Sequence, residues 1–479
     1  MTEPLEELYA HANGTHVVVV GGGVSGLVAA LECAKVGMRV TVLEADDRAG
    51  GVLRAGEVDG VVLDLGAESF ATRGGAVRRL VEELGLGDDV VAPAPGGAWV
   101  AGLPGIGAAP LPKGGVLGIP ANPFADDVRR ILGWGGAWRA YLDRLRPVLT
   151  IGHAHSLGRL VRTRLGAKAL DRLVAPVTSG VYSAHPDDID PDVAAPGLNA
   201  ALTRTGSLTG AVAAVVGERT AAPGGAVLGI RGGMARLADA LVDRLAVLGG
   251  DVRTGVAATA LERAGGGWRV HVAGDDAPLD AGLVVIATSE AAARSLIAPH
   301  ADGLAAAPAR PGPEVEIVTL VLDAPQLDAR PRGTGVLTVP GSHTAKALTH
   351  ATAKWQWVAD AAAGRHVVRV SFGTQGEAPA TAALDDDAAA ALALAEASAL
   401  LGVALPASAL RGAARARYTQ AQPAATLGLR AATDEARAAI RAVDGLGAVG
   451  AWLSGTGLAQ VVPDAAAEAE RLRRGALFS

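Results

Sequence analysis

The stretch that decides the fold is HVVVVGGGVSGLVAALECAKVGMRVTVLE, which runs from His16 to Glu44. The four valines at 17–20 predict a buried strand, and the apolar pattern that follows the glycines predicts a helix. Arg39–Leu43 predicts a second strand, which ends on Glu44. Strand, glycine turn, helix, strand and acid, in this order, indicate a dinucleotide-binding unit.

Each glycine of the turn has a chemical role in that unit. Gly21 permits the tight turn, Gly23 leaves room for a pyrophosphate, and Gly26 lets the helix pack close to the strand. The phosphates then lie at the helix N-terminus, where free N–H groups favour negative charge. Glu44 stands where a carboxylate is expected to accept a hydrogen bond from a ribose hydroxyl. The alternative is a glycine turn without a ligand, and the flanking strand and acid argue against it.

Length and composition limit the class of protein. A chain of 479 residues is too long for one core and predicts two or three domains. A net charge of −6 argues against a nucleic-acid partner, and the single Cys33 excludes an internal disulfide. The start resembles no signal peptide, and prolines and glycines interrupt the uncharged runs at 90–112 and 445–463. We therefore expect a cytoplasmic protein without a transmembrane segment, and peripheral membrane contact stays open.

A second glycine motif follows the acid. Glu44, Arg48, Gly50 and Gly51 form E-x3-R-x-GG, in which the two glycines would let the backbone approach a flat cofactor. The motif is similar to one in FAD enzymes that resemble amine oxidases and phytoene desaturases. The resemblance favours FAD over a nicotinamide nucleotide.

The rest of the chain predicts further parts. Apolar residues at helical spacing over 126–172 predict a helical region, and clustered glycine, proline and aspartate over 175–191 predict a turn-rich loop. Residues 281–288 predict a buried parallel strand, and alternation over 314–372 predicts antiparallel strands. The expected fold is α/β: an FAD-binding Rossmann-like domain with an inserted α+β substrate domain and a helical subdomain. We place the FAD domain at 1–95, 220–298 and 411–479, the substrate domain at 96–125 and 299–410, and the helical subdomain at 126–219.

Several motifs spread over the chain resemble one family, the HemY-type porphyrinogen oxidases, and within it the coproporphyrinogen III oxidases of Gram-positive bacteria. They are LDLGAESFATR (63–73), LPKGGVLGIP (111–120), SGVYSAHPDDI (179–189), GTGVLTVP (333–340), KALTHATAKW (346–355) and GTGLAQVVPDA (455–465). The resemblance implies FAD-dependent oxidation of coproporphyrinogen III to coproporphyrin III in haem synthesis. O2 would be the acceptor and H2O2 the second product, and transient contact with other haem-synthesis enzymes is open.

The resemblance and the glycine motifs together give the candidate site residues. The FAD contacts are expected at Gly21, Gly23, Val24, Ser25, Gly26, Glu44, Ala45, Arg48, Gly50, Gly51, Gly66, Ala67, Glu68, Val256, Thr288, Trp452, Gly455, Gly457, Val461 and Val462. The expected substrate contacts are Arg73 and Lys113 for carboxylates, Leu337 and Leu348 around the ring, and Gly180 for close backbone approach. No catalytic side chain and no metal ligand is expected, because the flavin N5 would carry the chemistry.

Other functions remain open at this point. The nearest keeps the chemistry and changes the substrate to protoporphyrinogen IX. An amine oxidase or carotenoid desaturase would share the FAD domain, although Tyr418, Trp452 and Phe478 are the only C-terminal aromatic residues that could form an amine oxidase's aromatic cage. A protein of another class, a non-catalytic carrier of FAD or a tetrapyrrole, is the third alternative.

Overall fold

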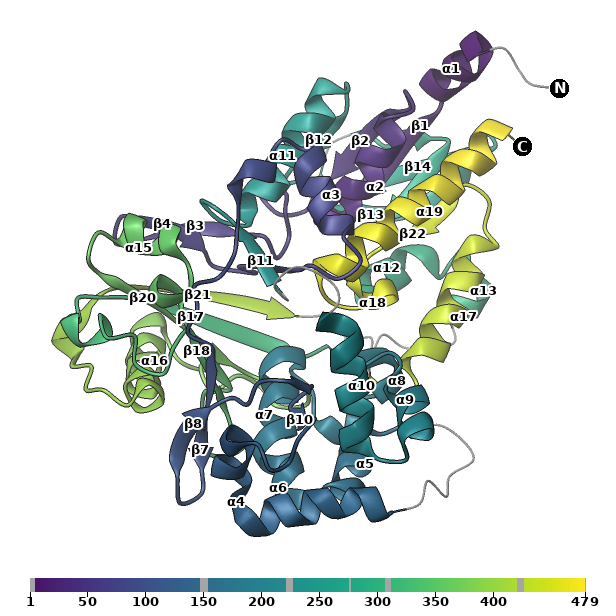
Figure 1. The fold of residues 1–479 in the computed structure, drawn as a ribbon. Helices are drawn as coiled ribbons and strands as arrows, with labels where there is room; N and C mark the ends of the chain where they lie inside the picture. Colours follow the sequence, from purple (N-terminus) through teal and green to yellow (C-terminus); the bar gives the residue numbers. More distant parts are fainter. Residues whose placement is uncertain are drawn as a thin grey trace.

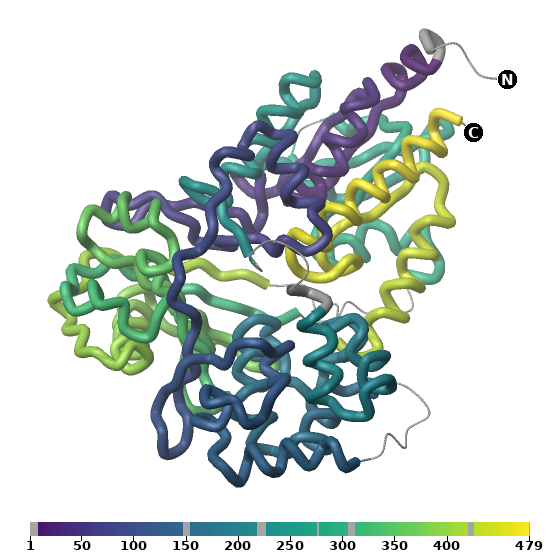
Figure 2. The backbone as a smooth tube through the Cα atoms, viewed as in Figure 1, coloured from purple at the N-terminus to yellow at the C-terminus, as the bar shows by residue number. Residues whose placement is uncertain are grey.

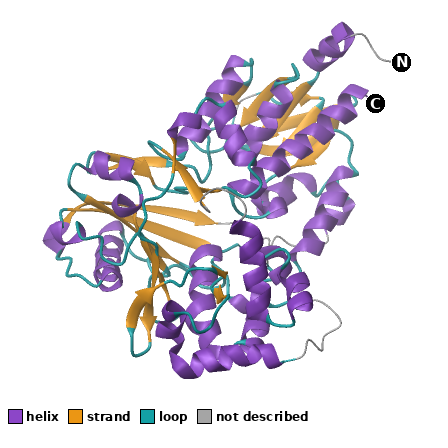
Figure 3. Ribbon diagram, viewed as in Figure 1, coloured by secondary structure: helices purple, strands orange, loops and turns teal. Residues whose placement is uncertain are grey.

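The structure is a computed structural model that describes residues 5–146, 154–220, 227–274, 277–305, 312–419 and 426–478. Figure 1 shows three parts: a nucleotide-binding part that carries both chain ends, a large sheet beside it, and a layer of helices below. Figure 3 shows that strands concentrate in the first two parts and helices in the third. Among these residues, none of the helices is both long and apolar enough to span a membrane.

The nucleotide-binding part is built on a parallel sheet of five strands. Its order is β12-β2-β1-β16-β22, with β1 in the centre. The bounds are β1 His16–Val20, β2 Arg39–Leu43, β12 Asp251–Arg253, β16 Leu283–Ile286 and β22 Leu446–Ala448. Each of the four valines of β1 is at most 4% exposed, because helices or strands cover both faces of the sheet. The predicted strands at 17–20 and 281–288 are confirmed, the second as Leu283–Ile286.

Two layers cover the parallel sheet. One side packs against α2 Val24–Ala34, α3 Ala76–Glu83, α11 Ala235–Val247 and α19 Leu458–Phe478. The other packs against the small sheet β13 Ala258–Ala264, β14 Gly267–Val272 and β15 Leu279–Ala281, and against α12 Glu290–Ile297, α13 Asp302–Ala305 and α17 Leu429–Arg441. Figure 2 shows the C-terminal α19 beside the N-terminal α2, although the two helices stand at opposite ends of the sequence.

A seven-stranded sheet forms the second part. Its order is β21 Leu410–Thr419, β17 Glu314–Leu322, β20 His366–Phe372, β19 Ala347–His350, β18 Gly335–Thr338, β7 Ala98–Leu103 and β8 Gly107–Pro110. The predicted antiparallel strands are confirmed except over 351–362, where the chain forms two short helices instead, and β18 pairs with β7 in parallel. Residues 411–419, which the sequence prediction assigned to the FAD domain, lie in this sheet, because β21 pairs along its length with β17.

Both faces of this sheet are covered. The alanine-rich α16 Asp386–Leu401 packs on one face. On the other lie α14 Ala351–Lys354, α15 Gln356–Ala362 and the hairpin β3 Ala55–Val58 with β4 Val61–Asp64. Short pieces complete the first two parts: α1 Leu5–Gly14, β5 Phe70–Ala71, β6 Val90–Val91, β11 Val227–Ile230 and α18 Ala451–Ser454. The hairpin of β9 Gly115–Val116 and β10 Ile119–Pro120 packs into the core of the helical layer.

The helical layer has its own core. Its helices are α4 Asp126–Tyr141, α5 Leu157–Arg164, α6 Ala167–Ala169, α7 Ala175–Val177, α8 Pro191–Ala194, α9 Leu198–Thr205 and α10 Leu208–Thr220, with π-helical turns at Leu170–Val174 and Thr178–Tyr182. The prediction of a turn-rich loop over 175–191 is thus wrong for its first half. Glycine and proline suggested turns there, but the backbone stays helical because apolar residues on both sides hold it in the core.

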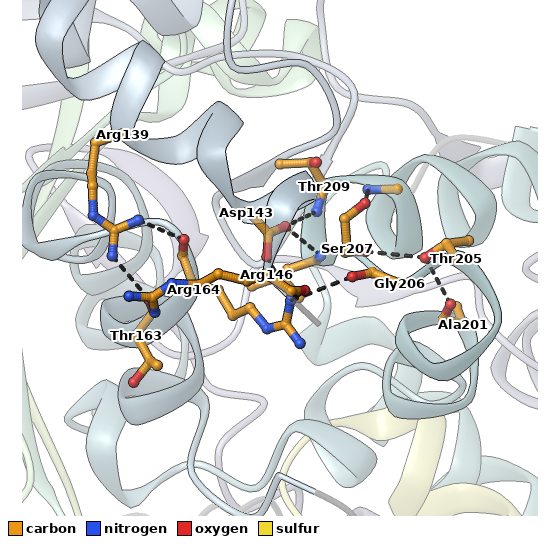
Figure 4. A network of polar contacts seen from close by, with 12 residues as sticks. Arg139, Asp143, Arg146, Thr163, Arg164, Ala201, Thr205, Gly206, Ser207 and Thr209 are labelled. Carbon is orange, nitrogen blue, oxygen red and sulfur yellow. Dashed lines mark hydrogen bonds and ion pairs between the residues drawn. The ribbon is translucent and has the colours of Figure 1, made fainter. Parts of the chain in front are cut away.

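A buried ion pair crosses this layer. Asp143 and Arg164 lie 3.0 Å apart, and the Asp143 carboxylate is fully buried. Its other oxygen accepts hydrogen bonds from the backbone N–H groups of Leu208 and Thr209, at 2.5 and 3.2 Å. Figure 4 shows that one carboxylate thereby joins the turn after α4, the end of α5 and the start of α10.

Candidate functional site

The turn between β1 and α2 forms an open cradle above a helix N-terminus. Gly21 has φ +107°, and a Cβ at Gly26 would lie 2.0 Å from the Gly21 carbonyl oxygen. A Cβ at Gly23, in contrast, would meet no heavy atom within 4 Å. Gly23 is the N-cap of α2, and no side chain caps the helix there. The free space and the backbone N–H groups together fit an anionic phosphate group.

Glu44 lies beside this cradle. One carboxylate oxygen accepts a hydrogen bond from Gly22 N–H at 2.7 Å, and the other from Asp46 N–H at 2.9 Å. Each carboxylate oxygen can accept more than one hydrogen bond. Glu44 can therefore also accept from a ribose hydroxyl at the edge of the cradle.

The second glycine motif folds back onto the first. Gly50 N–H donates to the Gly22 carbonyl at 2.8 Å, and Gly23 and Gly50 form a parallel bridge. Arg48 donates to the Ala55 carbonyl at 3.1 Å, so the guanidinium is held against β3. Two motifs that are separated in sequence thus form one surface.

Distant segments close the same surface. Val256 N–H donates to the Glu44 carbonyl at 2.8 Å. A Cβ at Gly450 would lie 3.8 Å from both Ser25 Oγ and the Thr288 carbonyl oxygen. The segment after β22 therefore reaches the start of α2. It continues through the predicted Trp452, Gly455 and Gly457 into α19, where Val461 and Val462 are buried.

Two buried polar groups near these segments have no hydrogen-bond partner in the described chain: the Trp452 indole N–H and the Tyr418 hydroxyl. Tyr418 belongs to β21, and its oxygen lies 3.0 Å from the position of a Cβ at Gly66. Buried polar groups without partners are rare in folded proteins. With the cradle at Gly23, they fit a large polar ligand such as a flavin dinucleotide.

Glu68 is fixed by two cations that the sequence did not single out. Its carboxylate lies 2.5 Å from Lys354 Nζ and 3.0 Å from an Arg369 nitrogen. Arg369 also donates to the Leu65 and Gly66 carbonyls, at 2.9 and 2.5 Å. Burial alone would raise the pKa of Glu68, but Lys354 and Arg369 lower it below its ordinary value. This clamp holds the 65–68 segment against the seven-stranded sheet.

A signal for Arg369 did exist in the sequence. It is the one charged residue inside the apolar run VVRVSF, and an arginine in a strand centre needs a buried acceptor. The acceptor could not be named, because the contact between β20 and the 65–68 segment spans some 300 residues of sequence.

The predicted substrate residues fall into two groups. A Cβ at Gly180 would lie 2.5 Å from the Leu337 side chain, so the helical layer and the sheet meet at these two residues. Leu348 pairs with Val336 and is buried toward α16, on the face opposite Leu337. The expectation that Leu337 and Leu348 enclose one ring is therefore corrected, because adjacent register positions alternate between faces.

The two cations that were predicted to contact substrate carboxylates, Arg73 and Lys113, are both exposed. Arg73 follows β5, and Lys113 lies between β8 and β9, where its backbone N–H donates to Asp127 at 3.1 Å. The structure does not join them to the Gly180–Leu337 contact, and their role stays a prediction.

A third cation lies closer to that contact. Lys346 is half-buried and its Nζ donates to Ser183 Oγ at 2.6 Å, next to the Gly180 turn. Burial lowers the pKa of Lys346 to about 8. A partly desolvated ammonium that is held by a neutral hydroxyl can bind an incoming carboxylate.

Comparisons with known proteins agree with this geometry. The family model for flavin-containing amine oxidoreductases matches residues 24–471. The coproporphyrinogen III oxidase of Propionibacterium freudenreichii subsp. freudenreichii is 31% identical, over 68% of this chain and 67% of its own length. That of Mycobacterium bovis is 33% identical over 77% and 78%. A solved structure from Exiguobacterium sp. 255-15, provisionally assigned as a protoporphyrinogen oxidase, superposes with a TM-score of 0.82 at 25% identity, over 96% of this chain and 98% of its own.

Proposed function

This chain belongs to the flavin-containing amine oxidoreductase family, and from that premise we propose that it oxidises coproporphyrinogen III to coproporphyrin III in haem synthesis. Its cofactor is FAD. Two relatives at 31% and 33% identity, each aligned over about two thirds or more of both chains, carry the name coproporphyrinogen III oxidase.

The observation that carries the proposal is the contact between Gly180 and Leu337. The two residues lie in SGVYSAHPDDI and GTGVLTVP, two motifs that are far apart in sequence and that both resemble those of the porphyrinogen oxidases. A Cβ at Gly180 would come within 2.5 Å of Leu337. The helical layer and the sheet therefore form one wall next to Lys346.

The residues of the nucleotide-binding part would hold the cofactor. The N-terminus of α2 would bind the pyrophosphate, Glu44 a ribose, and the N-terminus of α19 the pyrimidine edge of the flavin ring. When bound, FAD supplies a two-electron oxidation at a macrocycle carbon, so six electrons leave in three turnovers and three O2 become three H2O2. The Glu68–Lys354–Arg369 clamp fixes the backbone at 65–68, and Lys346 would hold a propionate.

The low aromatic content supports this reading over an amine oxidase. Of the three C-terminal aromatic residues, Phe478 is 71% exposed at the end of α19. That leaves Tyr418 on β21 and Trp452 on α18. Release of ammonia from simple amines would instead identify the chain as an amine oxidase.

The test is aerobic incubation of the holoenzyme with each porphyrinogen, following porphyrin fluorescence and peroxide together. We expect fluorescence and peroxide to rise in parallel, and faster with coproporphyrinogen III than with protoporphyrinogen IX. The reverse order of rates would make the chain a protoporphyrinogen oxidase. Tight porphyrin binding without peroxide would favour a carrier, and flavin that stays oxidised after anaerobic mixing with both substrates would refute the proposal.

A further inference from the structure

Ser183 ends the second π-helical turn of the helical layer in a backbone conformation that serine rarely adopts. Its φ of +52° and ψ of +32° lie in the left-handed region. Six described non-glycine residues have a positive φ, and Ser183 is the one among them that is buried, at 2% exposed. This conformation costs free energy that the surrounding contacts must offset, and such residues concentrate at functional sites.

Two parts of the molecule hold the Ser183 backbone in place. From the loop after β20, Thr374 Oγ1 and the Gln375 N–H both donate to the Ser183 carbonyl, at 3.1 and 2.8 Å. From the helical layer, the carbonyl of buried Thr178 accepts a hydrogen bond from the Ser183 N–H. The helical layer and the seven-stranded sheet together therefore fix the orientation of this residue.

The fixed backbone directs the Ser183 hydroxyl at a cation. Lys346 Nζ donates to Ser183 Oγ at 2.6 Å. Lys346 stands directly before β19, where its N–H donates to the Ser371 carbonyl at 2.9 Å and its carbonyl accepts from Thr338 Oγ1 at 3.0 Å. Both ends of the contact between serine and lysine are thus attached to backbone that other hydrogen bonds hold.

This contact lies at the wall that the helical layer forms with the sheet. A Cβ at Gly180 would lie 2.5 Å from the Leu337 side chain and 3.8 Å from the Lys346 carbonyl oxygen. Figure 1 shows α7, which leads into the π-helical turn, next to β18, the strand of Leu337. A serine hydroxyl accepts one ammonium hydrogen without carrying a charge, so the positive charge of Lys346 is kept for a ligand.

None of the acidic side chains in the described chain forms an ion pair with Lys346. Glu396, on the neighbouring α16, pairs with His343 at 3.4 Å, and Asp187, in the loop after the turn, pairs with Arg162 at 3.1 Å. Burial alone lowers the pKa of Lys346 to about 8. The neutral hydroxyl is therefore the contact that decides how the ammonium is oriented.

We propose that Ser183 is a positioning residue, whose hydroxyl orients the Lys346 ammonium so that it binds a propionate of the porphyrinogen. The identity of that carboxylate rests on the proposed function, whereas the contact between the two side chains does not. A Ser183 that served the fold of the turn alone would affect stability and leave the chemistry of Lys346 unchanged.

The first test needs no substrate. Acetylation of the full-length holoenzyme by acetic anhydride at a series of pH values, read by mass spectrometry of the Lys346 peptide, measures the pKa of this lysine. Ser183→Ala keeps the Cβ and removes the hydroxyl, and should lower that pKa by roughly one unit, because the ammonium loses its acceptor. Ser183→Gly, which suits the left-handed backbone, should lower it equally. An unchanged pKa in both variants would overturn the proposal.

The second test is the KM for coproporphyrinogen III. Ser183→Ala should raise KM about fivefold at neutral pH with kcat unchanged, and the rise of KM with pH should begin at lower pH. In a Lys346→Met background the same substitution should not change KM further, because the serine acts through the lysine. Ser156→Ala removes another buried hydroxyl of the helical layer, the N-cap of α5, and is the matched control. It should lower stability without changing KM or the pKa of Lys346.

The outcomes separate the hydroxyl from the backbone and from the substrate. An equal rise of KM with and without Lys346 would show that Ser183 acts through the fold of the turn, and would overturn the proposal. A normal KM in Ser183→Gly would overturn it too, since that variant lacks the hydroxyl. A lowered pKa of Lys346 in Ser183→Ala, with no porphyrinogen oxidised by the unmodified protein, would refute the proposed function and still support the positioning of Lys346.

Discussion

Gly23 and Gly26 stand three residues apart in one turn, yet a side chain would meet different surroundings at each. At Gly26 a Cβ would press on the Gly21 carbonyl at 2.0 Å. At Gly23 it would enter free space, with an extended backbone that any residue can adopt. One glycine is needed for the fold of the turn, and the other for the ligand.

These surroundings predict that substitution by alanine affects stability at Gly26 and FAD affinity at Gly23. Gly26→Ala should lower the unfolding free energy of the flavin-free protein by roughly 2 kcal/mol, because the turn or the helix must move. Gly23→Ala should leave that free energy unchanged and weaken FAD binding about tenfold, roughly 1.4 kcal/mol. Denaturation of the flavin-free protein and quenching of FAD fluorescence measure the two quantities. Equal flavin affinity in Gly23→Ala and the unmodified protein would mean that the pyrophosphate binds elsewhere.

Lys346 gives a prediction about pH. Burial brings its pKa from the ordinary 10.5 down to about 8, so the ammonium loses its proton as the pH rises through 8. If the ammonium holds a propionate, KM for coproporphyrinogen III should increase across that range. Lys346→Met should raise KM about tenfold at neutral pH and abolish this rise, and Lys346→Arg should keep a low KM to higher pH. The exposed Lys168→Met is the control, and a KM profile unchanged in Lys346→Met would exclude the role.

At the scale of elements, local patterns identified strands and helices but not their partners. The strand at β1 and the helices of residues 126–172 could be identified from the sequence, because the spacing of apolar residues along the chain determines them. The sequence does not show which face of the sheet Leu348 occupies. That depends on the register between β19 and β18, and an offset of one residue exchanges the two faces. The clamp around Glu68 was missed for a related reason: its cations come from a helix and a strand distant in sequence.

The Asp143 carboxylate gives a prediction at this scale. Asp143→Ala removes the partner of buried Arg164 and the N-terminal cap of α10, and should lower the unfolding free energy by about 3–5 kcal/mol. Asp143→Asn keeps an acceptor for the cap and should cost less. Denaturant unfolding measures both, and hydrogen exchange should show faster opening of α10. Similar stability of the two variants would mean that the charge, and not the cap, determines the effect.

At the scale of the whole molecule, a buried histidine makes the unfolding free energy depend on pH. His350 lies 3.4 Å from His366 between strands β19 and β20. Burial, and then the charges of His366 and Arg330, lower the pKa of His350 from 6.5 to about 4. The unfolded chain therefore binds a proton that the folded chain excludes, and the unfolding free energy falls as the pH drops from 6.5 toward 4.

This histidine should lower the unfolding free energy by about 3 kcal/mol at the acid end of that pH range, and should have almost no effect on it above pH 6.5. Subtracting the pH profile of His350→Leu from that of the unmodified protein isolates it, because the other titrating groups cancel. Urea unfolding at a series of pH values provides both profiles. The exposed His155→Leu should retain the full pH dependence, and a flat difference for His350→Leu would show that the histidine is not buried in its neutral form.

The order of strands in the parallel sheet has a consequence for synthesis of the chain. The first strand to leave the ribosome, β1, lies between β2 and β16, and the sheet closes only when β22 and then α19 arrive at the very end. The helical layer draws its core mainly from a continuous stretch and can form earlier. A nascent chain thus carries the apolar face of α2 without its partner α19 through most of translation, and a product that stops before α19 would be an aggregation hazard rather than a partly active enzyme.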